Sequence, residues 1–164
     1  MFDIYDSETV IKIYRMLKKK CDAIDRFINN HAMYYGSNSL EYGAIDVCNN
    51  IIDLMTRKNQ LINLKIIVDN AIRGLPENDK KILFIKMNYN ITMTELCSIL
   101  EIKERTAFRW CERAYLDLTD ALNNSKYCQK LRNIIDEESW INSIREEVKE
   151  RRMAFKFRVA EANV

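Results

Sequence analysis

The chain has 164 residues, of which 48% are hydrophobic and 30% charged, enough to bury the core of one ordinary domain. Its net charge is only +2, so overall charge gives no evidence for nucleic-acid binding, and such a function has to rest on a local arrangement. Three glycines and one proline are too few for the many turns of an all-β fold and favour long helices. We therefore expect an all-α protein.

The cysteines and the N-terminal residues indicate the cellular environment. The cysteines are odd in number, widely spaced and never arranged as CxxC, which argues against a disulfide framework or a zinc site: Cys21, Cys48, Cys97, Cys111 and Cys128. The first residues are acidic and lack the apolar run of a signal peptide, and no segment reaches membrane-spanning length. The sequence predicts a cytoplasmic protein without a membrane partner.

Residues 1–74 predict a helical hairpin. In the first helix, which Asp6 or Ser7 is expected to cap, a heptad seam is formed by Val10, Tyr14, Leu17, Cys21, Ile24 and Ile28. The second helix is expected from about Ala44 to Arg73, with a polar interruption at residues 57–60 and Gly74 ending it in a left-handed conformation. The hairpin seam is expected to pack within the chain, to pair with a second copy in a homodimer, or to contact RNA polymerase.

Residues 75–124 predict a helix followed by a helix-turn-helix. Pro76 suits the first turn of a helix that is expected to end near Met87. Thr92 and Glu95 then form a capping box, which predicts the start of a short helix over residues 93–100. The connection "EIK" and a further helix follow, at the spacing of a helix-turn-helix.

The inward positions of this motif hold small or apolar residues. We expect Cys97 at the helix crossing, Ile102 as the plug of the turn, and a buried stripe of Leu96, Leu100, Ala107, Trp110, Cys111, Ala114 and Leu118. Glu101 stands where the motif usually has glycine, and a left-handed conformation there costs about 1 kcal/mol. Lys103 is a poor helix cap.

The outward positions of the second helix are candidate DNA-binding residues: Lys103, Glu104, Arg105, Phe108, Arg109, Glu112 and Arg113. The N-terminal part of such a helix enters the major groove, so residues 104–118 are the expected recognition helix. Arg105 and Arg109 can reach guanine or phosphate, Phe108 can contact a thymine methyl, and Arg113 is better placed for phosphate. The alternative is an ordinary three-helix cap whose mixed-charge face is solvated.

The segments "LPENDKKILFIKM" and "ITMTELCSILEIKERTAFRWCERA", within residues 75–122, resemble the fourth conserved region of bacterial σ factors. With the preceding hairpin, "ERTAFRW" is similar to the ArpU/RinA-type regulators of late-gene transcription in phages and prophages of Gram-positive bacteria. The resemblance implies recognition of double-stranded promoter DNA by Arg105, Phe108, Arg109 and Arg113, and often contact with RNA polymerase.

Residues 125–164 predict a short helix and then an amphipathic helix from Ser139 to about Ala160. Its basic end forms a candidate secondary basic patch: Lys149, Arg151, Arg152, Lys156 and Arg158. Interleaved with Phe155 and Phe157, these residues suit nucleic-acid backbone or an acidic protein surface. The alternative is a helix that lays its cations over apolar contacts or uses this surface for self-association.

No catalytic constellation or glycine-rich phosphate loop occurs, and His31 is the one histidine, so we expect neither an enzyme nor a cofactor or metal site. The function that the sequence favours is a sequence-specific DNA-binding transcription regulator of phage or prophage origin. One alternative is an alternative σ factor that contacts RNA polymerase directly. A third, from another class, is a helical assembly or adapter protein such as a phage small-terminase-like subunit.

Overall fold

The computed structural model describes residues 1–37, 43–89 and 91–161, and of residues 35–37, 44 and 155–161 it describes the backbone alone. Over this part of the chain all regular structure is helical, which confirms the all-α prediction. The helices are α1 (Ile4–Ser37), α2 (Ala44–Arg73), α3 (Glu77–Asn88), α4 (Met93–Leu100), α5 (Glu104–Asn123), α6 (Cys128–Glu137) and α7 (Ser139–Glu161). None of these helices is long and apolar enough to cross a membrane.

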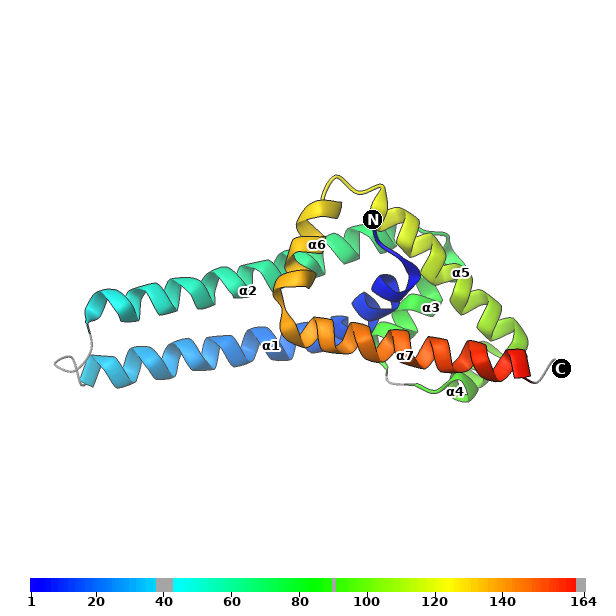
Figure 1. The fold of residues 1–164 in the computed structure, drawn as a ribbon, viewed down its shortest axis with the longest axis horizontal. Helices are drawn as coiled ribbons and strands as arrows, with labels where there is room; N and C mark the ends of the chain where they lie inside the picture. Colours follow the sequence, from blue (N-terminus) through cyan, green and yellow to red (C-terminus); the bar gives the residue numbers. More distant parts are fainter. Residues whose placement is uncertain (38–42, 90, 162–164) are drawn as a thin grey trace.

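Helices α1 and α2 lie side by side and run in opposite directions (Figure 1). Their far ends project beyond the other helices, and we call this part, residues 21–37 and 44–56, the arm. At the other end α3 and α5 pack against α1, α4 packs against α5, and α7 runs along α1 towards the start of α5. We call this second part the head.

One hydrophobic core joins the base of the arm to the head. The heptad seam of α1 is confirmed, since Val10, Leu17 and Ile24 are buried and its other members pack partly buried against them. Each of the other helices contributes at least one fully buried side chain, among them Leu64 of α2, Leu83 of α3, Leu96 of α4, Leu118 of α5, Leu131 of α6 and Ile141 of α7. Burial of this apolar surface is the main force that holds the helices together.

The first turn of α1 is tied to α5. The prediction that Asp6 or Ser7 caps this helix is wrong, because the helix begins at Ile4 and both residues lie inside its first turns. Asp3 takes the capping role, because its carboxylate accepts a hydrogen bond of 2.9 Å from the backbone N–H of Asp6. In return, the backbone N–H of Asp3 donates a hydrogen bond of 2.9 Å to the Asp6 carboxylate. Ser7 is buried and its Oγ lies 2.7 Å from Thr119 Oγ1 on α5. The N-terminal residues therefore help to position α5.

The polar interruption of α2 contacts the junction between α6 and α7. Arg57 donates two hydrogen bonds of 2.6 and 2.7 Å to the buried carboxylate of Glu138, which also accepts one of 2.7 Å from Trp140 Nε1. Burial raises the pKa of Glu138, but the bonds and charge of Arg57 and the bond from Trp140 outweigh it and hold the pKa below its usual range. The break in the apolar pattern is thus a docking point between helices.

The connection from α2 to α3 differs from the prediction in two ways. Gly74 has φ −79° and ψ −9°, a right-handed conformation, so the expected left-handed cap is wrong. Its N–H donates instead to the carbonyl of Ala71 at 3.2 Å, which continues the helical turn. Pro76 precedes α3 as its N-cap and is not part of the first turn, and its carbonyl accepts from Asp79 and Lys80.

Candidate nucleic-acid interface

Helix α4 begins at the predicted capping box. Thr92 Oγ1 accepts a hydrogen bond of 3.2 Å from the backbone N–H of Glu95, and the Glu95 carboxylate accepts one of 2.6 Å from the backbone N–H of Thr92. The backbone N–H and the hydroxyl of Thr92 both donate to the Glu95 carboxylate and lower its pKa, because they favour the charged form. The box satisfies two backbone donors that the start of a helix leaves free. It confirms where α4 begins.

The turn from α4 to α5 is made by Glu101. This residue has φ 52° and ψ 40°, a left-handed conformation, and is the one non-glycine residue with positive φ in the described chain. The N–H of Ile102 donates to the carbonyl of Cys97 at 3.1 Å and closes the turn. Lys103 precedes α5 and makes no capping bond with its side chain, as expected. Three residues therefore suffice to change the chain direction between the two helices.

Replacing Glu101 with glycine should raise the free energy of unfolding by about 1 kcal/mol, because glycine adopts the left-handed conformation without a clash of its Cβ. Urea denaturation followed by circular dichroism measures the change. Glu101→Ala is the matched control, since alanine removes the carboxylate and keeps the strain. Equal stabilisation by both variants would show that the charge, and not the backbone conformation, is the cause.

The inner face of α5 is largely as predicted. Ala107, Cys111, Ala114 and Leu118 are buried. Trp110 is 38% exposed, so its prediction as a core residue is wrong. Successive residues lie about 100° apart around a helix, and Trp110 directly precedes the buried Cys111, which places the indole beside the buried stripe and not within it.

The sequence pattern missed three buried residues of α5, namely Thr119, Leu122 and Tyr115, and Tyr115 is only 7% exposed. Its spacing of four from Cys111 was the available signal, because residues four apart share a helix face. The guanidinium of Arg152 on α7 lies 5.6 Å from the centre of its ring, a cation–π contact. Tyr115 thereby connects α5 to α7.

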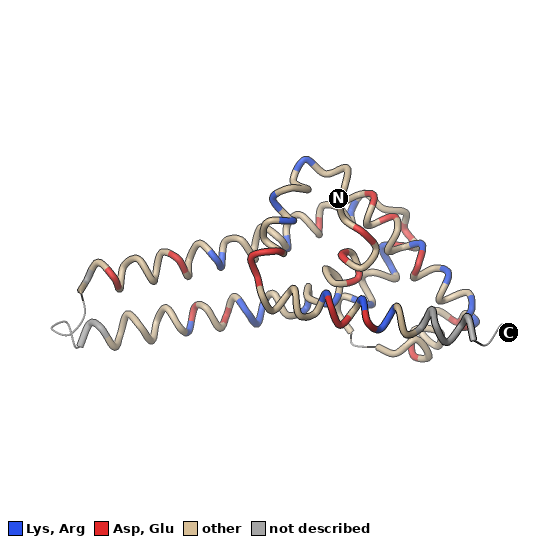
Figure 2. Tube along the Cα trace, viewed as in Figure 1, with Lys and Arg blue, Asp and Glu red and all other residues tan. Residues whose placement is uncertain are grey.

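The outer face of α5 carries a row of arginines. Arg105, Arg109 and Arg113 follow one another at intervals of four residues, and all three are exposed. We call these three residues the arginine stripe. Lys103 and Glu104 are also exposed, at the beginning of the helix. Figure 2 shows the basic positions spaced along α5 on the side of the head turned away from the arm.

The members of the arginine stripe differ in their partners. Arg105 and Arg109 form no ion pair with any side chain that the structure describes, and neither does Lys103. Arg113 Nη2 lies 3.9 Å from Asp79 Oδ2 on α3, and its Nε lies 3.6 Å from Asp117 Oδ2. Three positive charges at the start of α5, those of Lys103, Arg105 and Arg109, therefore have no acidic partner among the described side chains.

Asp79 is the buried acid beneath this face. Burial raises its pKa and the nearby Asp117 raises it further, while the charge of Arg113 lowers it. The Arg113 side chain is 65% exposed, so its pairing with these carboxylates is screened by water and weak, at most about 1 kcal/mol.

Phe108 and Glu112, also predicted to face DNA, lie on the side of α5 next to α7. The Glu112 carboxylate accepts hydrogen bonds of 3.1 and 3.2 Å from Arg152 Nη1. Phe108 is 38% exposed and lines a hollow of about 330 Å³ together with Glu112, Arg152 and Met93. The structure thus brings five of the seven predicted residues to the outer face and the start of α5, and directs these two towards α7.

The described cations of the secondary basic patch pair with acids of the same chain. Lys149 Nζ lies 2.7 Å from a Glu146 carboxylate oxygen, and both Arg151 and Arg152 bind the carboxylate of Glu8 on α1. Arg152 also binds Glu112, so its guanidinium joins α7 to α1 and α5. The side chains of Lys156 and Arg158 lie outside the described residues.

The fold places the chain among all-α proteins in which a short capped helix, a tight left-handed turn and a longer helix with three exposed arginines follow one another. No family model, curated protein or solved structure matches the chain. Among the described residues no group of histidine, cysteine and acidic side chains could hold a metal ion.

Proposed function

We propose that the chain is a sequence-specific DNA-binding transcription regulator in which α4, the Glu101 turn and α5 form a σ-region-4-like helix-turn-helix. The left-handed turn sets the direction of α5 relative to α4. Burial of Leu96 on α4 and Ala107 on α5 holds the two helices in that relation. The first turns of α5 then project from the head, as required of a helix that enters the major groove.

The observation that carries the proposal is the pair Arg105 and Arg109, which lie one helical turn apart, are exposed, and have no acidic partner among the described side chains. A guanidinium matches the O6 and N7 acceptors of guanine and the oxygens of phosphate with two parallel hydrogen bonds. Neutralising phosphates releases counterions and favours binding. Lys103 and Arg113 extend the positive charge on both sides of this pair.

Selection of duplexes from a random-sequence DNA library with the purified full chain tests the proposal. We expect one sequence to be enriched, and fluorescence anisotropy to show that it binds about 1,000-fold more tightly than a scrambled duplex, the lower end of typical specificity ratios. The logarithm of the affinity should fall linearly with the logarithm of the salt concentration, with a slope of about −0.9 for each phosphate neutralised. Equal affinity for selected and scrambled duplexes would contradict sequence-specific recognition.

A further inference from the structure

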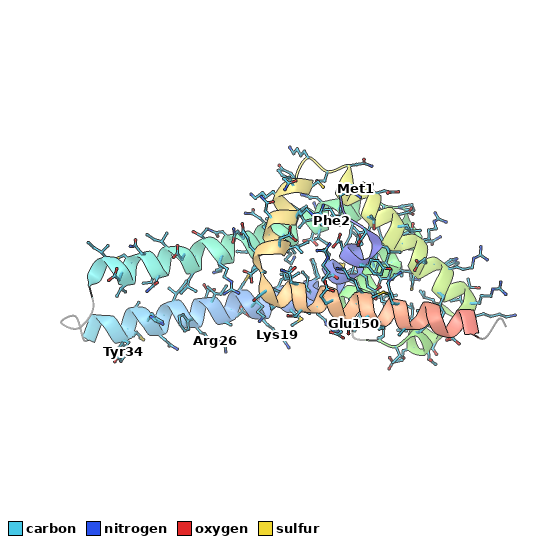
Figure 3. All side chains as sticks on the ribbon, in the orientation of Figure 1. Met1, Phe2, Lys19, Arg26, Tyr34 and Glu150 are labelled. Carbon is cyan, nitrogen blue, oxygen red and sulfur yellow. The ribbon has the colours of Figure 1, made fainter. Side chains whose placement is uncertain are left out.

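Helix α2 exposes a row of large apolar side chains. Ile45, Ile52, Met55, Ile62 and Ile66 are 76%, 57%, 53%, 39% and 51% exposed. They are distinct from the residues of α2 that pack towards α1 and the core, such as Leu61, Leu64 and Val68. No other described helix lies alongside the arm in Figure 1, and Figure 3 shows side chains projecting freely from both of its helices.

The spacing of this row is that of a coiled coil. With two further exposed residues, the row reads Ile45, Cys48, Ile52, Met55, Asn59, Ile62 and Ile66, at alternating intervals of three and four. We call these seven residues the outer seam. Isolated apolar residues are common on protein surfaces, but a heptad repeat that continues over three heptads indicates a helical partner. The outer seam is therefore suited to pairing with another helix.

We propose that the outer seam pairs with the outer seam of a second copy of this chain, so that the two α2 helices form a parallel, in-register, two-stranded coiled coil. Isoleucine occupies three of the four positions that begin each heptad, namely 45, 52 and 66, and β-branched residues there favour two parallel strands. The proposal does not depend on DNA binding.

Asn59 selects the partner and the register. It occupies the remaining heptad-initial position, near the middle of the outer seam, and is exposed. In a parallel, in-register pair its amide faces the same amide of the second copy, and the two can hydrogen-bond. A shifted or antiparallel pair would set each amide against an apolar side chain and leave it unsatisfied. A single polar residue at such a position is a known device for specifying register and strand number.

The charges beside the outer seam are compatible with self-pairing. One flank is neutral: Asn49, Thr56 and Asn63. On the other flank, Lys58 Nζ lies 2.7 Å from an Asp25 carboxylate oxygen. Lys65 Nζ lies 3.0 Å from the Asp69 carboxylate. Because both ammonium groups are neutralised within their own chain, two copies can approach without repulsion between like charges.

Sedimentation equilibrium of the full chain tests the pairing. We expect a mass twice that of the 19.5 kDa chain, and Ile52→Asp with Met55→Asp should return the single-chain mass while circular dichroism keeps its helical signal. Ile99→Asp is the control, because Ile99 is 53% exposed on α4, which lies at the end of the head far from the arm, and this variant should remain a dimer. A monomeric or trimeric wild-type chain, or a dimer that survives the double substitution, would overturn the proposal.

Cys48 tests the direction of the two helices. It is exposed, and it lies in the outer seam opposite the same cysteine of the second copy only if the pair is parallel and in register. Diamide, a two-electron thiol oxidant, should therefore link the wild-type chain into a covalent dimer on a non-reducing gel, and Cys48→Ser should abolish the product. A dimer by sedimentation that gives no Cys48-dependent cross-link would overturn the parallel register.

Discussion

Replacing Arg105 and Arg109 together with alanine should weaken binding to the selected duplex by about 2–6 kcal/mol, since each contact to a guanine is worth about 1–3 kcal/mol. Both side chains are exposed at the start of α5, so the substitutions should leave the fold intact. Fluorescence anisotropy with selected and scrambled duplexes separates two modes of action. Loss confined to the selected duplex indicates base contacts, whereas equal loss on both duplexes and a smaller salt slope indicate phosphate contacts.

The control for this variant removes the same charge elsewhere. Lys18 and Lys19 are exposed on α1, and their replacement with alanine also removes two positive charges. We expect the affinity of this variant to stay close to that of the wild type, because charges outside the interface are screened at physiological salt. A loss equal to that of the arginine variant would show that the net charge of the chain, and not the outer face of α5, determines binding.

Leu118→Ala should lower the free energy of unfolding by about 2–5 kcal/mol, through lost burial and the cavity left in the core. Leu118 has no exposed surface and belongs to the core that α5 shares with α1 and α3. Urea denaturation followed by circular dichroism measures the change. A loss of this size is a large part of the stability of an ordinary domain.

The same substitution two residues earlier provides the comparison. Leu116 lies on the same helix and is 49% exposed, so Leu116→Ala should change the free energy of unfolding by about 0.5 kcal/mol or less. The two variants remove the same atoms from the same helix and differ only in the face on which they lie. Similar losses in both would mean that α5 does not pack with the orientation described.

If both proposals hold, they define one arrangement. A parallel pair of α2 helices would place two heads at the same end of the dimer, each with its own α5. Dimeric helix-turn-helix proteins bind two half-sites whose separation follows from the distance between their recognition helices. The selected DNA sequence would then contain an inverted repeat, which the selection experiment would reveal directly.

Several boundaries of this fold could be predicted from local signals in the sequence. The Thr92–Glu95 capping box marks the start of α4, and the short "EIK" connection correctly places the start of α5 at Glu104. Glu101 stands where the motif usually has glycine, and it does adopt the left-handed conformation that this position requires. These features depend on hydrogen bonds and backbone angles within a few residues, so the sequence alone carries the information.

Other features were decided only by the tertiary structure. Helical periodicity predicts the direction of a buried stripe but not its width, and so it assigned Trp110 to the core although the neighbouring helices leave it exposed. Asp6 and Ser7 suited a cap but lie buried inside α1, where Ser7 contacts Thr119 of α5 and Asp6 pairs with Arg145 of α7.

The ion-pair partners of charged residues were also decided only by the tertiary structure. Arg152 binds Glu8 and Glu112, which are 144 and 40 residues away in the sequence, and these contacts join α7 to α1 and α5. The sequence determined which segments are helical and which of their faces are apolar, because both depend on near neighbours. Which cations remain available to a partner depends on contacts between distant segments, and therefore on how the helices pack.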